Sequence, residues 1–129
     1  MRIALVSLLL LITACIPAKS FENANQLLSS CELFLGSVRA QGNGFAIQTN
    51  DPGALQCWGY IQAAQELSAI VDEGAKHPLT RACPPAESTG LQLVRVFVSY
   101  AQRHPEHLHE RAGLLVIEAF RAAFPCSTR

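Results

Sequence analysis

Four cysteines, spread along most of this 129-residue sequence, constrain the fold more than any other feature. They are Cys31, Cys57, Cys83 and Cys126. Consecutive members are at least 26 residues apart, whereas zinc sites use close pairs such as C-x-x-C. An even number of distant cysteines in a small exported domain is typical of a disulfide framework. The sequence therefore predicts a fold closed by two disulfides, provided that the chain leaves the cytoplasm.

The N-terminal segment indicates export. Arg2 is followed by an apolar run over residues 3–14, which only two hydroxyl residues interrupt. A transmembrane helix needs about 20 apolar residues, so this run is too short to serve as a membrane anchor. A basic start before a short apolar stretch is the pattern of a secretory signal peptide. We therefore expect residues 1–20 to be a signal peptide and residues 21–129 to form the mature helical domain.

A fifth cysteine, Cys15, leaves two cleavage sites open. The segment Ala18-Lys19-Ser20 has small residues at both ends and predicts a cut before Phe21. The segment that ends in Ala14-Cys15 resembles instead the bacterial lipobox, in which the cysteine is lipidated and becomes the new N-terminus. Because the preceding stretch is short for a lipoprotein signal, we favour release without a lipid and keep Cys15 as the alternative lipid anchor.

Composition excludes several classes of protein. Hydrophobic residues make up 50% of the sequence and charged residues 16%, which suits a packed core and not a disordered chain. The formal net charge is zero, whereas nucleic-acid-binding domains usually present a basic patch. The sequence contains no P-loop, dinucleotide fingerprint, GxSxG elbow or HExxH motif. We therefore expect no enzyme activity, no cofactor and no nucleic-acid partner.

Apolar residues three and four apart predict four amphipathic helices. The first is expected over about residues 22–41, because glycines follow it directly. The second is expected over about residues 52–73, because Asp51 ahead of a proline is a favourable helix start. The expected buried stripe of the second helix consists of Trp58, Ile61, Leu67, Ile70 and Val71.

The third and fourth segments predict an antiparallel pair of helices. The third is expected over about residues 90–103, where Thr89 and Gln92 have the spacing of a capping box. The fourth is expected over residues 105–124 and ends at Pro125. Since almost no linker separates these two segments, they should turn back on each other.

This helical pair favours one disulfide pairing. It brings Cys126 back beside the start of the third helix, close to Cys83, and leaves Cys31 and Cys57 for the first two helices. Four cysteines allow three connectivities, so the pairing is a hypothesis. The expected fold class is all-α, a small four-helix bundle stapled by two disulfides.

Histidines gather at the start of the fourth segment without predicting a metal site. His104, His107 and His109 accompany Glu106 and Glu110, and imidazole and carboxylate groups suit several divalent ions. On a continuous helix, however, His109 lies about 200° from His107, so the three imidazoles do not converge. We expect a polar helix start, with both glutamates favoured by the positive end of the helix dipole, and no metal site.

No other group predicts catalysis. Bridged cysteines leave no free thiol for nucleophilic chemistry. Asp72 and Glu73 are adjacent, and adjacent helical positions point about 100° apart, which is typical of a solvated helix end. Trp58 and Tyr60 are residue types enriched at protein interfaces, but we expect Trp58 to pack in the core.

Two linkers are longer than a helical bundle needs. They cover residues 42–51 and 75–88, whereas helix connections in bundles usually have about 2–8 residues. Long loops often carry recognition. The expected function class is therefore binding of another molecule through these loops.

An ordered set of short motifs resembles the Rap/Tai family of immunity proteins. The set consists of Cys57-Trp58-Gly59-Tyr60-Ile61, Cys83-Pro84-Pro85, Gln92 with Tyr100, His104-Pro105-Glu106, and Phe124-Pro125-Cys126. It covers almost the whole mature chain, and Pro84 stands where the family usually has Leu. Members of this family are small exported proteins associated with type VI secretion systems of Gram-negative bacteria.

The resemblance implies a periplasmic, all-helical and often homodimeric protein that binds a secreted toxin. Several relatives occlude the active site of a peptidoglycan amidase, so an amidase effector is the implied partner. Only the cysteines and the segment 58–61 match by position, and these are expected to be structural. Contact with a membrane is expected only if Cys15 is lipidated.

A different function class is the alternative. Small helical proteins with disulfides also serve as general periplasmic chaperones or envelope-stress proteins. Tight binding of one partner would favour the immunity protein, whereas weak binding of many unfolded clients would favour the chaperone.

Overall fold

The computed structural model describes residues 20–127 of the chain. The expected signal peptide, apart from Ser20, and the alternative lipid anchor Cys15 lie outside the described residues. Among the helices that the structure describes, none is both long and apolar enough to cross a bilayer.

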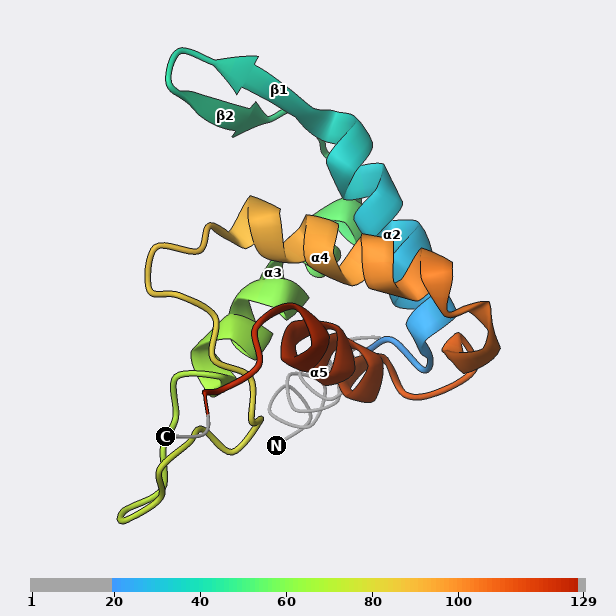
Figure 1. The fold of residues 1–129 in the computed structure, drawn as a ribbon. Coiled ribbons are helices and arrows are strands. Elements are labelled where there is room, and N and C mark those ends of the chain that lie inside the picture. Colours follow the sequence, from blue (N-terminus) through green and yellow to red (C-terminus); the bar gives the residue numbers. More distant parts are fainter. Residues whose placement is uncertain (1–19, 128–129) are drawn as a thin grey trace, which may run out of the picture.

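Over residues 20–127, the fold consists of four helices, one short 3₁₀ helix and one two-stranded sheet (Figure 1). In chain order they are α2 (Ala24–Ser37), β1 (Val38–Gln41), β2 (Gly44–Ile47), α3 (Pro52–Leu67), α4 (Gly90–Arg103), η1 (Pro105–His107) and α5 (Ala112–Ala123). The fold is therefore mostly helical, as the sequence predicts, with one departure from the all-α class.

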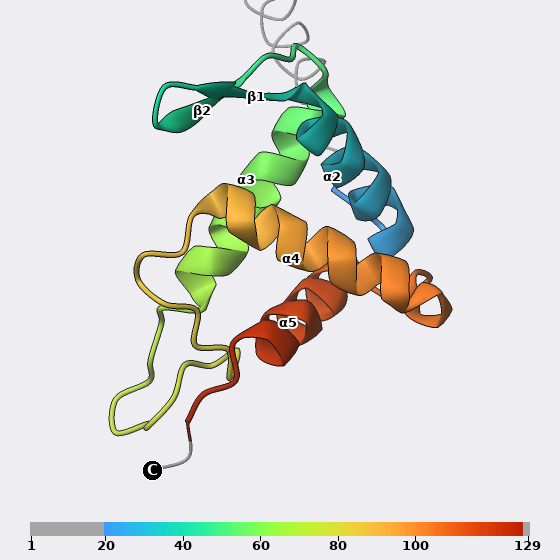
Figure 2. The same cartoon turned by 45° about the horizontal axis from the view of Figure 1, so that its top comes forward.

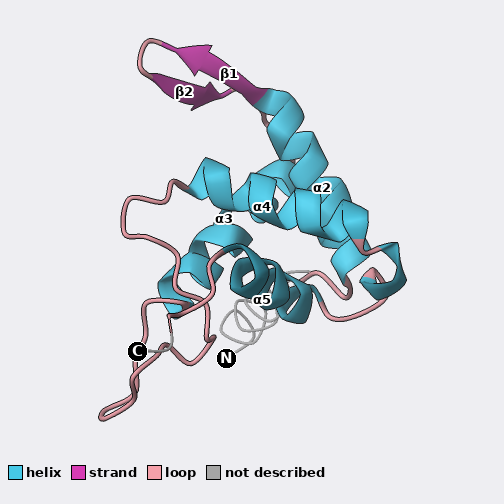
Figure 3. Cartoon of the chain, viewed as in Figure 1, coloured by secondary structure: helices cyan, strands magenta, loops and turns pink. Residues whose placement is uncertain are grey.

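That departure is a β-hairpin at the end of α2. The first helix was expected to reach residue 41, but it ends at Ser37, and the antiparallel strands β1 and β2 follow (Figure 3). Gly42 begins the two-residue turn between the strands with φ +56°, a conformation that suits glycine. The glycine that was expected to stop a helix therefore turns a hairpin, which projects beyond the helices (Figures 1 and 2).

The second helix, α3, begins as expected and ends early. The side chain of Asp51 caps its start, but the helix ends at Leu67 instead of residue 73. At this end the hydroxyl of Ser68 donates a hydrogen bond of 2.9 Å to the carbonyl of Ala64. The prediction of a buried stripe on the second helix is therefore wrong at the C-terminal end, where Leu67, Ile70 and Val71 are exposed.

The third helix, α4, has the expected bounds, and the hydroxyl of its N-cap Thr89 accepts from the backbone N–H of Gln92 at 3.2 Å. The expected fourth helix is interrupted. Only Pro105–His107 form a 3₁₀ turn at its start, and α5 begins at Ala112.

Hydrogen bonds to α2 explain this interruption. The first N–H groups of a helix have no partner within the helix. In α2 those of Ala24 and Asn25 donate to the carbonyls of Glu110 (2.8 Å) and Leu108 (2.9 Å). In a continuous helix these two carbonyls would accept from residues four positions further on. The segment between η1 and α5 therefore satisfies two N–H groups at the start of α2, while the side chain of the N-cap Asn23 accepts from the N–H of Gln26.

The four helices enclose one hydrophobic core. Its largest fully buried side chains are those of Phe34, Phe97, Phe120, Leu27, Ile61, Leu93 and Leu115. In Figure 2, α5 turns back along α4, as the short connection between them predicts. Disulfides join Cys31 to Cys57, between α2 and α3, and Cys83 to Cys126, the pairing that the predicted helical pair favours.

Candidate functional site

The connection between α3 and α4, residues 68–89, is the longest in the described part of the chain, and we call it the 68–89 loop. It contains the linker 75–88 that the sequence singles out. In Figure 1 it extends beyond the C-terminal end of α3, away from the four helices.

The C-terminal half of this loop is fastened to α5 and the residues after it. Besides the Cys83–Cys126 disulfide, the N–H of Cys83 donates to the carbonyl of Phe124 at 2.9 Å. Arg121 Nε donates a hydrogen bond to the carbonyl of Thr80. The base of the loop therefore has a defined conformation before any partner binds.

Backbone geometry at Arg81 shows the same constraint. This residue has φ +53°, in the left-handed region, which costs about 1–2 kcal/mol for a residue with a Cβ. Its neighbours Thr80 and Ala82 are both buried, and its N–H donates to the carbonyl of Pro78 at 2.8 Å. Strained backbone of this kind persists where the surrounding structure enforces it.

Exposed apolar side chains gather at the end of α3 and on this loop, and we call them the apolar patch. They are Leu67, Ile70, Val71 and Leu79, with exposed fractions of 52%, 47%, 50% and 59%. The N–H of Leu79 donates to the carbonyl of Ile70 at 3.2 Å, which brings the two sides of the loop together. Exposed large apolar side chains that gather in one part of a surface can mark a site of interaction with another protein. The apolar patch is therefore the candidate binding site.

Basic side chains lie beside the apolar patch. An open hollow between the loop and the end of α5 is lined by Lys76, His77, Leu79, Arg81, Arg121 and Pro125, among others. Three of these residues are cations, and each is exposed. A complementary partner surface would therefore have an apolar centre and acidic groups at its edge.

The other long linker lies elsewhere. Residues 42–51 contain β2 and lead into α3, so they lie at the opposite end of α3 from the 68–89 loop (Figures 1 and 2). Phe45 of β2 is partly exposed and packs edge-on against Trp58, with ring centroids 6.1 Å apart. The two linkers therefore form two separate surfaces.

The aromatic pair of α3 is structural. Trp58 is half-buried and stacks on the buried Phe34 at 5.1 Å, so it packs against the core as expected. Tyr60 packs edge-on against Phe21, and burial raises the pKa of its hydroxyl. Both side chains are therefore engaged in contacts with other aromatic rings.

The paired carboxylates are in the loop and not at a helix end. Asp72 and Glu73 are exposed and follow the end of α3 by several residues. Their solvated character agrees with the sequence interpretation, whereas the expected helical position is wrong because α3 is shorter than predicted.

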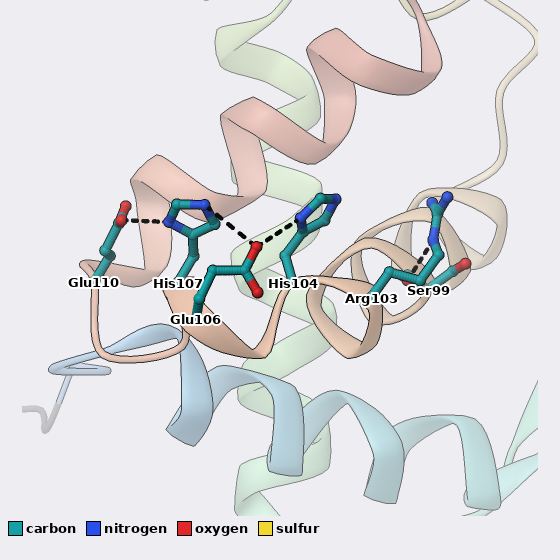
Figure 4. A network of polar contacts seen from close by, with 6 residues as sticks. All are labelled: Ser99, Arg103, His104, Glu106, His107 and Glu110. Atoms are coloured by element: carbon teal, nitrogen blue, oxygen red, sulfur yellow. Dashed lines mark hydrogen bonds and ion pairs between the residues drawn. The ribbon is translucent and has the colours of Figure 1, made fainter.

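The histidines are arranged differently from the expectation. His104, His107 and the glutamates Glu106 and Glu110 lie together at η1 (Figure 4), while His109 is exposed and takes no part in this group. The hydrogen bond that His107 donates to the carboxylate of Glu110 raises the pKa of His107. The pKa of Glu106 is lowered, first by the hydrogen bond between its carboxylate and its own backbone N–H, and then by the hydrogen bond with His104.

Sequence reasoning missed the apolar patch because it assigned most of these residues to the core. One local signal was available: Ile70 and Val71 are adjacent β-branched residues, which lower helix propensity. Leu79 carries no such signal, because its exposure follows from the path of the loop.

Comparison with known proteins gives one result. The family model described as Rap1a immunity proteins matches residues 23–126, a range that includes all the described helices and all four bridged cysteines. No curated protein and no solved structure matches the chain.

Proposed function

Because this chain belongs to the Rap1a family of immunity proteins, we propose that it binds one type VI secretion effector and sterically blocks its active site. Immunity proteins of this kind generally act by binding and not by catalysis. We further propose that the protein works in the periplasm and that its effector is a peptidoglycan amidase.

The observation that carries this proposal is the apolar patch on a loop whose base is fixed. The Cys83–Cys126 disulfide and the Arg121 hydrogen bond order the base of the 68–89 loop in the free protein. A loop ordered in advance loses less conformational entropy on binding, which raises affinity. Inserted into a cleft, its apolar side chains would exclude substrate.

Two features support a periplasmic location. Disulfides persist in oxidising compartments such as the bacterial periplasm, and this domain contains two. The N-terminal sequence has the pattern of a signal peptide. An effector that cleaves peptidoglycan would act in the same compartment, so inhibitor and toxin would meet there.

Binding and inhibition by matched variants test the site. The assay measures the Kd for the secreted hydrolase encoded by an adjacent gene, and its residual peptidoglycan cleavage. We expect Leu79→Asp to weaken binding by about 2–4 kcal/mol, roughly 30- to 1,000-fold in Kd, because it places a charge in a desolvated contact. Leu33→Asp is the control, because Leu33 is equally exposed (56%) but lies on α2.

A third variant separates the two linkers. If Phe45→Asp abolishes inhibition while Leu79→Asp leaves it unchanged, the hairpin and not the 68–89 loop contacts the effector. If the wild-type protein binds no single partner but weakly captures many unfolded clients, the general periplasmic chaperone replaces the immunity function.

A further inference from the structure

The turn between α4 and α5 brings four ionisable side chains together, and we call them the turn cluster: His104, Glu106, His107 and Glu110. Figure 4 shows the carboxylate of Glu106 between the two imidazole rings, with Glu110 on the far side of His107. The three histidines do not converge, as expected, because His109 lies outside the turn cluster. The break between η1 and α5 instead brings Glu106 between His104 and His107.

Three atoms of the turn cluster have the separation of metal ligands. Glu106 Oε1 lies 3.2 Å from His104 Nδ1 and 3.7 Å from His107 Nε2, and all three atoms lie within 4.8 Å of one another. A tetrahedral zinc ion with ligands at about 2.1 Å spaces neighbouring ligand atoms about 3.4 Å apart. Small side-chain rotations, with the proton of His104 moved from Nδ1 to Nε2, would therefore place all three atoms around one ion.

We propose that His104, Glu106 and His107 bind a divalent transition-metal ion of the Zn²⁺ class. The ligand atoms are His104 Nδ1, Glu106 Oε1 and His107 Nε2. Imidazole nitrogens with one carboxylate oxygen suit such ions better than Ca²⁺ or Mg²⁺, which prefer oxygen ligands alone.

Glu110 orients one of the ligands. Its carboxylate lies 2.6 Å from His107 Nδ1, so Nδ1 carries the proton and donates it in this hydrogen bond. The lone pair of His107 is then on Nε2, the atom that faces Glu106. A carboxylate that holds the far nitrogen of a ligating histidine is a recurrent feature of zinc sites.

The second imidazole is also held in place. The ring of His104 lies against that of Tyr100, with centroids 4.3 Å apart. Arg103, its neighbour in the chain, donates instead to the backbone carbonyl of Ser99 at 3.1 Å (Figure 4). Among the described residues, the ion pairs of Glu106 are with histidines alone, so no lysine or arginine competes with a bound cation.

The turn cluster is half-exposed and supplies three ligands, so a tetrahedral ion would keep one position for water or for a donor from another molecule. It lies at the end of α4 opposite to the 68–89 loop. Metal binding is therefore independent of the proposed inhibition of an effector, and each can fail without the other.

Among the described residues, a second group that contains a histidine has a different chemistry from the turn cluster. His77 lies near Cys83 and Cys126, but these sulfurs form a disulfide and are not thiolates. Metal ions bind cysteine as the thiolate, so this group does not form a competing site.

Calorimetric titration with Zn²⁺, followed by Co²⁺ absorption spectroscopy, tests the proposal on untagged protein with both disulfides formed and no reductant present. We expect saturable one-to-one binding that weakens below neutral pH, because protons compete for the imidazoles. His104→Ala and His107→Ala should each abolish it. Glu110→Gln should weaken it about 10- to 100-fold, the usual effect of losing an outer-shell partner.

His109→Ala is the matched control, because His109 belongs to the same turn and is exposed, yet lies outside the turn cluster. It should bind Zn²⁺ like the wild type. NMR of the wild-type protein gives a readout that needs no variant: the imidazole signals of His104 and His107 should shift on addition of Zn²⁺. Absence of saturable binding, or shifts confined to other histidines, would overturn the proposal.

Discussion

Substituting Gly90 by alanine should destabilise the protein, although glycine to alanine usually stabilises a helix. Gly90 is the first residue of α4, and a Cβ on it would clash with Gln62 Oε1 and would lie 2.6 Å from Trp58 Cη2 and 2.9 Å from Cζ3. Real Cβ contacts are longer than 3.0 Å, so the indole ring must move. Phe34 stacks on this ring and Phe45 contacts it edge-on, so that movement disturbs both neighbours.

The size of the expected change in unfolding free energy for Gly90→Ala follows from two opposing effects. Overpacking of this kind costs about 1–3 kcal/mol. The better helix propensity of alanine returns at most about 1 kcal/mol. We therefore expect a net loss of about 1–2 kcal/mol, and each kcal/mol lowers the Tm of a domain of this size by roughly 4–8 °C.

Gly59→Ala is the matched control. Gly59 lies inside α3, and a Cβ there would meet nothing within 4 Å. The unfolding free energy of this variant should exceed that of the wild type by about 0.5–1 kcal/mol, because alanine loses less backbone entropy than glycine on folding. The two substitutions are chemically identical, so the opposite signs isolate the close contacts of position 90 with Gln62 and Trp58.

Urea unfolding followed by circular dichroism measures both changes, and fluorescence reports directly on Trp58, the single tryptophan of the chain. The emission of Gly90→Ala should differ from that of the wild type, while that of Gly59→Ala should not. If Gly90→Ala proves neutral or stabilising with unchanged emission, the argument from close contact is refuted.

Two further predictions concern the disulfides and pH. Replacing Cys83 and Cys126 by serine removes a bridge across 43 residues, which should cost about 4 kcal/mol of unfolding free energy in chemical denaturation. It should also weaken effector inhibition more than loss of the Cys31–Cys57 bridge, which leaves the base of the 68–89 loop intact. Burial raises the pKa of Tyr60, so its contribution to stability is present below about pH 10 and is lost as pH rises through the raised value. Ultraviolet absorbance titration should show late ionisation that Tyr60→Phe removes, and ionisation of Tyr60 at an ordinary pKa would contradict the assigned burial.

Local interactions explain the parts of the fold that the sequence predicts. Thr89 caps α4 and Asp51 caps α3 through hydrogen bonds to residues three positions away, and such contacts can be inferred from spacing alone. The apolar spacing of α4 predicts the face that is buried. The short connection after Arg103 makes α5 return beside α4, which explains why the Cys83–Cys126 pairing was favoured.

Contacts between distant segments decided the rest, including both candidate sites. The carbonyls of Leu108 and Glu110 accept from the start of α2, about eighty positions earlier in the chain, and this interrupts the predicted fourth helix. That interruption creates the turn cluster. The Cys83–Cys126 bridge similarly ties the 68–89 loop to the residues after α5, and Leu79 of this loop is exposed.

The sequence by itself thus determined the four helical segments and most of their buried faces, because caps and apolar spacing act within a few residues. The tertiary structure alone decided the β-hairpin, the end of α3 and the start of α5. The start of α5 follows from hydrogen bonds with the beginning of α2, more than eighty positions earlier in the chain. The hairpin packs through Phe45 against Trp58 of α3, and α3 ends where the loop that follows it folds back on Ile70. Spacing within one helical segment does not reveal such contacts between elements, so the sequence pattern could not predict them.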